Sequence, residues 1–280
     1  MLKKINKKQK IISLIILLIL IGFSVLLLVK NRQKNSSTSQ TSEVVKKKIS
    51  QPVNIIPVSE RPFMQLIPSS DGHYVTVNVL ELKKPASQLT YEMEYQTGSM
   101  LQGFQGSLAL NKLPAADRKL FGSQSAGGAI TYHEDIKGGT LLAEFNGNED
   151  YAVKSAWTYI DVAQNMASSA GTPNTFSSED GKFSLTSQEL NKYRYLVIYN
   201  TPGFPGQLAN EPVSDVYTIS ADQSLSSVKQ TVTVSFQTDQ QSASIMAYDG
   251  QAWQTLDTSS ENGQLTASAE LMEAYLLVLE

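Results

Sequence analysis

Cysteine is absent from the 280-residue sequence, and histidine occurs only twice, as His73 and His133. Without cysteine the chain can form no disulfide, use no thiol nucleophile and build no cysteine-ligated metal site. Two histidines are too few for a multi-histidine metal centre. The lack of cysteine suits the cytoplasm and the cell exterior equally, so the compartment must be inferred from other features.

Positive charge is scarce in most of the chain and concentrated at its start. Residues 1–50 carry 11 Lys and Arg against one acid, Glu43, whereas residues 51–280 carry 12 Lys and Arg against 25 Asp and Glu, a net charge of −13. Nucleic-acid binding needs a basic face on the folded part of a protein. We therefore expect no nucleic-acid partner.

The one long apolar run is Ile11–Val29, which contains no charged residue. Nineteen residues at 1.5 Å each cross a hydrocarbon core of roughly 30 Å, so the run predicts a transmembrane helix anchored in the lipid bilayer. Five lysines precede it in residues 1–10, and Lys30, Arg32 and Lys34 follow it. The positive-inside rule then predicts a single-pass cell-membrane protein with a cytoplasmic N-terminus and an extracellular C-terminal body.

A cleaved signal peptide is the alternative to this signal-anchor. Signal peptides have an apolar region of about 7–15 residues and a small-residue cleavage site. The run here is longer, and "KNRQKN" follows it without such a site. The polar residues 30–52 lack apolar periodicity and predict a flexible tether.

From about Val53 onward the sequence favours β-strands. Apolar and polar residues alternate in "HYVTVNV", "LTYEMEY" and "TVTVSFQ", which places Val75, Val77 and Val79, for example, on one face. Such alternation is typical of half-buried antiparallel strands. The continuous apolar runs "YLVIYN" and "AYLLVLE" predict a central strand and a final strand.

Asx-Gly pairs separate these strands and are strong cues for two-residue hairpin turns. They occur at Asp71-Gly72, Asn146-Gly147, Asp180-Gly181, Asp249-Gly250 and Asn262-Gly263. Helical periodicity is nearly absent, and its best candidates are short turns at residues 115–120 and 187–192.

The polar stretch Gln164–Gly181 divides the body into halves of the size of a β-sandwich. We therefore predict an all-β fold of two tandem antiparallel, Ig-like β-sandwich domains after one N-terminal transmembrane helix. The expected parts are a basic cytoplasmic tail (1–10), the transmembrane helix (11–29), the tether (30–52), domain 1 (53–165) and domain 2 (166–280).

Two arrangements of residues resemble catalytic sites. Glu92 and Glu94 lie about 7 Å apart on one strand face, near the spacing of glycosidase carboxylates, but alternate acids on a strand are ordinarily its solvent side. Ser125, His133 and Asp135 are the elements of a serine nucleophile set. The surrounding "GSQSAGG" lacks the Gly-x-Ser-x-Gly pattern, which favours a glycine-rich loop between strands.

Binding motifs are equally sparse. The acidic stretches "GNEDY" and "SSEDG" lack the spaced oxygen ligands of a calcium loop, and there is no phosphate loop or dinucleotide fingerprint. We therefore predict no catalytic, cofactor-binding or metal-binding residues, and no cofactor.

Aromatic residues are the remaining candidates for binding. Trp157 and Tyr159 share a strand face and are expected in the core. In "SIMAYDGQAWQTLDT", a two-residue turn at Asp249-Gly250 would pair Met246 with Trp253 across a hairpin. Both faces of that hairpin are apolar, so the sequence does not identify the buried face. It favours a hairpin locked by the Met246–Trp253 pair, and an exposed binding platform is the alternative.

The segment "VYTISADQSL…VTVSF…IMAYDGQAWQTLDT…NGQLTAS" resembles the closing part of β-sandwich modules in bacterial surface proteins. The earlier "LTYEMEYQTG…GFQGSLAL…LFGSQSAGG…YHEDIKGGTLLAEFNG" is similar to a module of uncharacterised single-span surface proteins of candidate-phylum bacteria. In that module two cysteines flank the glycine-rich loop. Gln124 and Ala129 or Ile130 stand there in this chain, so the bridge implied by the resemblance would be missing.

Taken together, these features predict a non-enzymatic, membrane-anchored surface protein with a binding or structural role. Its partner would be an envelope protein or a glycan. The alternatives are a subunit of a membrane-proximal envelope or secretion assembly and a glycan-acting envelope enzyme.

Overall fold

The computed structural model describes residues 52–167, 174–187 and 190–279. The predicted tail and transmembrane helix, and almost all of the tether, lie outside these residues. No helix in the described ranges is both long enough and apolar enough to cross a membrane.

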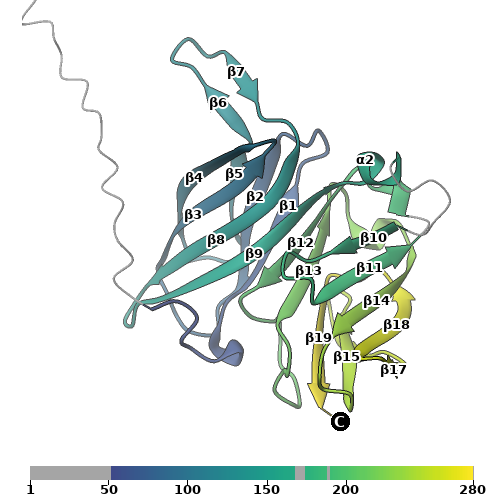
Figure 1. Cartoon of the computed structure of the whole chain (residues 1–280). Helices are drawn as coiled ribbons and strands as arrows, with labels where there is room; N and C mark the ends of the chain where they lie inside the picture. Colours follow the sequence, from purple (N-terminus) through teal and green to yellow (C-terminus); the bar gives the residue numbers. More distant parts are fainter. Residues whose placement is uncertain (1–51, 168–173, 188–189, 280) are drawn as a thin grey trace, which may run out of the picture. The chain divides into compact units, whose positions relative to one another are not determined.

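The described chain is all-β, with antiparallel pairing throughout its sheets (Figure 1). The largest sheet has nine strands in the order β16-β15-β19-β13-β12-β9-β8-β3-β4. In that order they are Trp253–Thr255, Ala243–Tyr248, Ala274–Leu279, Val216–Ala221, Tyr195–Thr201, Tyr151–Asp161, Ile136–Asn146, Gln88–Thr97 and Met100–Ala109.

Three smaller sheets complete the fold. A three-stranded sheet contains β1 (Phe63–Pro68), β2 (Tyr74–Glu81) and β5 (Ala115–Leu120). A five-stranded sheet contains β10 (Asn174–Ser177), β11 (Phe183–Ser187), β14 (Thr231–Gln237), β18 (Gln264–Glu270) and β17 (Ser259–Glu261). The hairpin of β6 (Gly122–Gln124) and β7 (Ile130–Tyr132) projects from the body (Figure 1).

Helical structure is short in the described ranges. It consists of η1 (Val58–Glu60), α2 (Val162–Ala167), η2 (Leu190–Lys192) and η3 (Leu225–Ser227). The helical turn expected at 115–120 is wrong, because these residues form β5 and pair with β2. The second predicted helical turn, at residues 187–192, is confirmed for residues 190–192, which form η2.

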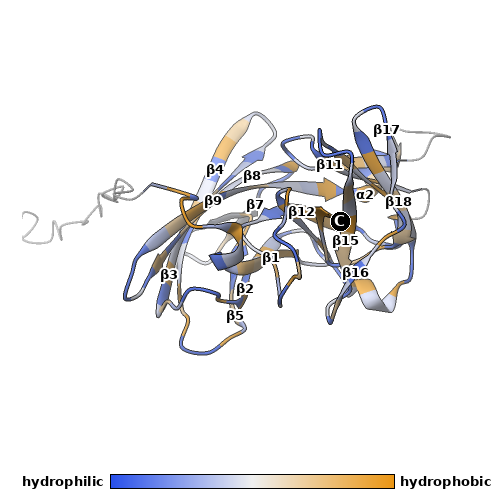
Figure 2. Ribbon diagram, turned by 90° about the horizontal axis from the view of Figure 1, so that it is seen from below, coloured by the Kyte–Doolittle hydropathy of each residue, from blue (hydrophilic) through white to orange (hydrophobic). Residues whose placement is uncertain are grey.

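The predicted strand faces are confirmed. Hydrophobic and hydrophilic positions alternate along the strands (Figure 2). The inward residues of the three alternating runs are all buried, namely Val75, Val77, Val79, Leu89, Tyr91, Met93, Tyr95, Val232, Val234 and Phe236. The alternation predicts the buried face correctly because successive side chains of a strand point to opposite faces, with a period of two residues.

Strand β12 lies between two hydrophobic cores. Val197 and Tyr199 belong to the core under the three-stranded sheet, together with Trp157. Leu196 and Ile198 point the other way, into the core that the five-stranded sheet covers. All four β12 side chains are buried, which explains the continuous apolar run in "YLVIYN".

The predicted division at residues 165/166 falls inside α2. β9, which ends just before α2, and β12, which follows the expected linker, pair with each other from Tyr195↔Asp161 to Tyr199↔Trp157. Residues Gln51–Glu280 cluster as one compact unit. The two halves of the body are therefore joined by a common sheet and not only by a linker. The residues expected to form that linker include α2 and β10.

Most Asx-Gly pairs lie in loops longer than two residues. Among those in the described ranges, only Asn262-Gly263 joins directly paired residues, Glu261 and Gln264, and both turn residues have positive φ. The three Asp-Gly pairs instead form Asx-turns. The Oδ1 atoms of Asp71, Asp180 and Asp249 accept the backbone N–H two residues later, at 2.8–3.1 Å.

This changes the register of the hairpin of β15 and β16. Tyr248, not Met246, lies opposite Trp253, because Asp249–Ala252 form a four-residue loop. The expected Met–Trp pair is therefore wrong. The faces are unchanged, since the register shifts by two residues and preserves the side on which each residue lies.

Candidate functional site

The paired carboxylates lie on the outer face of β3. Glu92 and Glu94 alternate with Tyr91, Met93 and Tyr95, whose side chains fill the core. Neither glutamate lines a described cavity. The solvent-facing interpretation of these two residues fits their position.

The structure separates Ser125 from His133, two of the three residues of the predicted serine nucleophile set. Ser125 lies at the tip of the β6–β7 hairpin, where its N–H donates to the Ala129 carbonyl at 2.9 Å. His133 lies at the base, and its N–H donates to Phe121 O at 2.9 Å. Along the hairpin, the level of Ser125 and that of His133 are four residues of extended chain apart, which is about 13 Å at 3.3 Å per residue. Ser125 and His133 therefore form no nucleophile–base pair.

The acidic stretches have structural partners. Glu149 pairs with Lys84 at 2.5 Å, and Asp150 Oδ1 accepts the Gly147 N–H at 3.1 Å. Asp180 accepts hydrogen bonds from the hydroxyls of Ser178 and Tyr217. Within the described ranges no three His, Cys, Asp or Glu side chains come together as metal ligands.

The aromatic candidates divide between core and surface. Trp157 is fully buried and stacks on Phe121 with ring centroids 6.1 Å apart, as expected of a core residue. Trp253 is half-buried, packs near Tyr248 at 5.3 Å, and donates its Nε1–H to Pro205 O at 2.8 Å. Trp253 thus fastens the loop that contains Pro205 to the sheet.

A polar cleft of about 320 Å³ contains both histidines of the chain. Its walls come from the β1–β2 loop, the segment after β7, the end of β9, α2 and the start of β12. The lining residues are Asp71, Gly72, His73, His133, Glu134, Asp135, Ile136, Tyr159, Asp161, Gln164, Arg194 and Tyr195. We call this the polar cleft.

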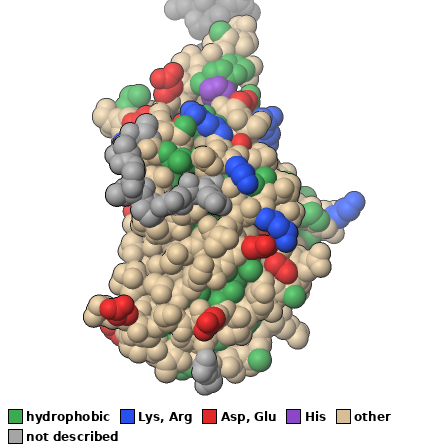
Figure 3. Space-filling view, turned by 90° about the vertical axis from the view of Figure 1, so that its right-hand side faces the viewer, with side chains coloured by type: hydrophobic (Ala, Val, Ile, Leu, Met, Phe, Trp, Pro, Cys, Tyr) green, Lys and Arg blue, Asp and Glu red, His purple; other side chains and the backbone are tan. Residues whose placement is uncertain are grey.

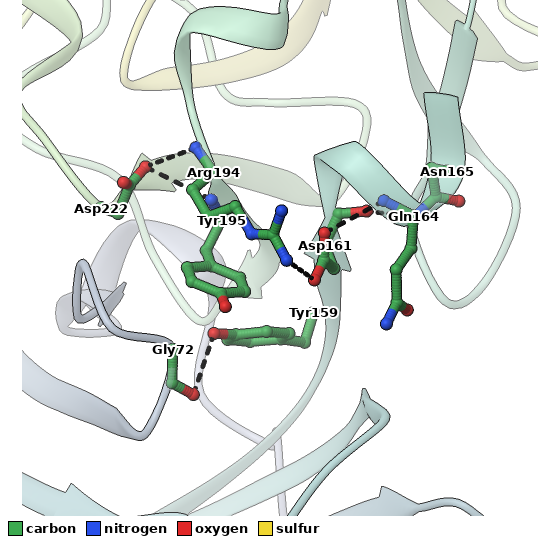
Figure 4. Close-up of polar contacts among 8 residues, drawn as sticks. All are labelled: Gly72, Tyr159, Asp161, Gln164, Asn165, Arg194, Tyr195 and Asp222. Carbon is green, nitrogen blue, oxygen red and sulfur yellow. Dashed lines mark hydrogen bonds and ion pairs between the residues drawn. The ribbon is translucent and has the colours of Figure 1, made fainter. Parts of the chain in front are cut away.

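Two tyrosines occupy one side of the polar cleft (Figure 4). The rings of Tyr159 and Tyr195 lie 5.6 Å apart, tilted by 37°. Burial is the main reason that the pKa of Tyr159 is raised, so its hydroxyl stays protonated and donates to Gly72 O at 3.2 Å. Gly72 has φ +73°, and a Cβ there would lie 2.4 Å from the Tyr195 ring. Glycine therefore lets the β1–β2 loop pack directly on Tyr195.

An arginine–carboxylate pair lies beside the tyrosines (Figure 4). Arg194 donates from a terminal nitrogen to Asp161 Oδ2 at 2.8 Å. Asp161 also caps α2, because its Oδ1 accepts the Gln164 N–H at 3.1 Å. Asp222 Oδ1 accepts the backbone N–H groups of Arg194 and Tyr195, at 3.1 and 3.3 Å. These bonds fix the backbone from which the guanidinium projects.

The two histidines each contact an aromatic ring. His73 stacks on Tyr132 with centroids 3.8 Å apart, and His133 Nδ1 lies 2.9 Å from the Tyr95 hydroxyl. Hydrogen bonds from the Ser69 hydroxyl and the His73 N–H hold the pKa of Asp71 below its usual range. In the space-filling view a histidine lies among acidic and basic side chains near one end of the face shown (Figure 3).

No local sequence pattern indicates this cleft. Tyr159 was expected in the core, where its ring is indeed largely buried, but Asp161, Arg194 and Tyr195 belong to no motif. They meet because β12 pairs with β9 across an intervening segment of more than thirty residues. Comparisons with known protein families, curated proteins and solved structures find no match to this chain.

Proposed function

We propose that the protein is a membrane-anchored cell-surface protein whose exported body binds an envelope glycan in the polar cleft. The anchor is the apolar run Ile11–Val29, oriented by the lysines before it with the body outside the cell. In this proposal the body consists of two β-sandwich domains that share the nine-stranded sheet. The role is binding rather than catalysis.

The observation that carries the proposal is the combination of aromatic and hydrogen-bonding groups in one cleft. Tyr195 is half-buried and lines the cleft, and in this proposal the part of its ring not covered by Gly72 and Tyr159 contacts the apolar face of a sugar ring. Arg194 and Asp161 sit beside it and offer N–H donors and carboxylate oxygens for sugar hydroxyls. Hydrogen bonds to charged groups are the stronger ones, so this pair can both orient and hold a saccharide.

The size of the cleft supports a small ligand or a short part of a polymer. Its volume of about 320 Å³ lies at the lower end of ligand pockets, which span roughly 300–1,000 Å³. One or two sugar rings of a longer chain would fit there, with the remainder in solvent. A polymer ligand would keep an anchored protein against the envelope surface.

The test is a binding titration with a panel of purified cell-envelope polysaccharides, followed by calorimetry. Arg194→Ala removes the guanidinium, and we expect at least a tenfold loss of affinity, about 1.4 kcal/mol. Lys229→Ala is the matched control, because Lys229 also forms an exposed ion pair, with Glu270 at 3.3 Å, but does not line the polar cleft. Exposed pairs contribute about 0–1 kcal/mol, so both variants should fold.

Two results would contradict the proposal. One is that no polysaccharide of the panel binds, and the other is that Arg194→Ala binds as tightly as the unmodified protein. The location is tested separately by protease treatment of intact cells, which should remove the body and leave residues 1–30 protected.

A further inference from the structure

The strand β4, Met100–Ala109, is a free edge of the nine-stranded sheet (Figure 1). It pairs with β3 over its whole length, from Gln88↔Ala109 to Thr97↔Met100. In the described ranges no other strand pairs with it. An edge of this kind presents a row of backbone donors and acceptors that a further strand can use.

The geometry identifies which backbone groups are directed outward. The Leu110 N–H donates to Ser87 O at 2.9 Å, and a Cβ at Gly103 would lie 2.8 Å from the Met93 carbonyl oxygen, which therefore points at β4. Hydrogen-bonded and non-bonded pairs alternate in antiparallel sheets. The even-numbered residues of β4 thus bond to β3. The N–H and C=O groups of residues 101, 103, 105, 107 and 109 are directed away from it.

β4 lacks the features that usually protect an edge strand. Its sequence, MLQGFQGSLA, has no charged residue and no proline in ten positions. The side chains of Met100 and Leu101 are 57% and 63% exposed. Charged residues, prolines and short length are the common means by which proteins prevent edge-to-edge pairing.

The other described edges of the sheets differ in this respect. The edge strands β16 and β17 have three residues each, and β10 has four. β5 carries Asp117, Arg118 and Lys119. β1 is covered, because Met64 N–H bonds to the Thr201 hydroxyl and the Gln65 amide bonds to Glu273. β4 is therefore the one long and uncharged edge in this part of the chain; β5 lies near it but forms no hydrogen-bonded pairing with it.

We propose that β4 pairs with β4 of a second copy of this chain, antiparallel and centred on Gln105. In this register Leu101 lies opposite Ala109, Gly103 opposite Ser107, and Gln105 opposite itself. Each of these residues directs its N–H and C=O outward, so the two edges are complementary under a two-fold axis. The two nine-stranded sheets become one.

The charge distribution makes β4 the place at which two copies of the body can meet. Residues 51–280 have a net charge of −13, so two bodies repel each other over most of their surfaces. β4 is a strip without charge, and identical strands can approach there without placing like charges opposite each other. The pairing does not involve the polar cleft, so it is independent of the proposed glycan binding.

The absence of cysteine makes a direct test possible in the complete chain. Gln105→Cys places two thiols opposite each other, and Cα atoms in a hydrogen-bonded antiparallel pair are about 5.5 Å apart, within disulfide range. Membranes from cells that produce this variant are oxidised mildly and run on a non-reducing gel. We expect a band at twice the chain mass of 30.7 kDa. Ser260→Cys, on the exposed strand β17, is the matched control and should stay monomeric.

Other outcomes of the cross-linking would overturn the proposal. Equal cross-linking of Gln105→Cys and Ser260→Cys would mean random collision. A band of a different mass would mean that β4 receives a strand from another protein. Absence of any band at Gln105→Cys would mean that β4 does not self-pair.

A second variant tests the same contact without a cysteine. Gln105→Lys places two ammonium groups opposite each other at the axis, while its exposed side chain and outward N–H leave the β3 pairing intact. Sedimentation of the full chain in detergent should show loss of the dimer. Thr90→Lys adds the same charge one strand inward, opposite Ser107, and should remain dimeric. A Gln105→Lys variant that dimerises like the unmodified chain would contradict the proposal.

Discussion

The position of β12 between two cores predicts that both cores unfold together. Leu196 and Ile198 contribute to one core and Val197 and Tyr199 to the other. Each buried side chain of this kind stabilises the fold by about 2 kcal/mol. If one core unfolded alone and β12 came away, the remaining core would lose two of these side chains, about 4 kcal/mol. That is a large part of the 5–15 kcal/mol that stabilises a typical domain.

The perturbation is Leu185→Ala in β11. Leu185 is fully buried in the core under the five-stranded sheet, and removing such a leucine costs about 3 kcal/mol. The reporter is Trp157, which is fully buried in the other core. Trp253→Phe in the background leaves Trp157 as the only tryptophan. The protein studied is residues 52–280, because every described strand pairs with another described strand.

The assay is urea unfolding followed by Trp157 fluorescence and, in parallel, by far-ultraviolet circular dichroism. With a slope of about 3 kcal/mol per M urea, a loss of about 3 kcal/mol lowers the midpoint by about 1 M. We expect both signals to shift by this amount and to coincide. Leu279→Ala, at an exposed position, is the control and should change stability by about 0.5 kcal/mol or less. A Trp157 transition that stays in place while the dichroism separates into two steps would refute the reasoning.

Two further predictions concern backbone packing and pH. Gly139→Ala should lower the melting temperature by several degrees, because a Cβ there would lie 2.2 Å from Glu94 O; Gly127→Ala, with no atom nearer than 3.9 Å, should not. Burial raises the pKa of Tyr95 to about 12, whereas an unfolded chain has a tyrosine pKa of about 10. Between pH 10 and 12 the unfolded chain loses a proton that the folded chain keeps, so stability should fall as the pH rises. Tyrosinate absorbance should then increase together with unfolding, and a full increase in the still-folded protein would contradict this.

Local sequence patterns predicted those parts of the fold that depend on neighbours along the chain. The alternation in residues 74–79, 89–95 and 231–237 identified the strands and their buried faces, since the period of two is a property of a single strand. Turn chemistry was predicted less well. Asp-Gly was expected to close two-residue hairpins, but the aspartate side chain can also satisfy backbone N–H groups within a longer loop, and it does so at Asp71, Asp180 and Asp249.

Local sequence patterns could not predict the polar cleft or the free edge, because both depend on how strands are ordered in a sheet. Tyr159 and Tyr195 are close only because β9 and β12 are neighbours. β4 has no charged residue, which is visible in the sequence, but its position at an edge is not. Hydrogen bonding between strands is a long-range interaction that leaves no periodic signal in either strand alone.

The sequence by itself determined that the body is all-β, which faces of its strands are apolar, and that its chemistry excludes thiols and disulfides. These properties follow from residue types and from a period of two. Only the tertiary structure decided that the side chains of "YLVIYN" pack into two different cores and that both halves of the body share one sheet. It also decided that an arginine, a carboxylate and two tyrosines lie together beside both histidines. A continuous apolar run shows that a strand is buried on both sides, but what buries it depends on chain segments far away in the sequence.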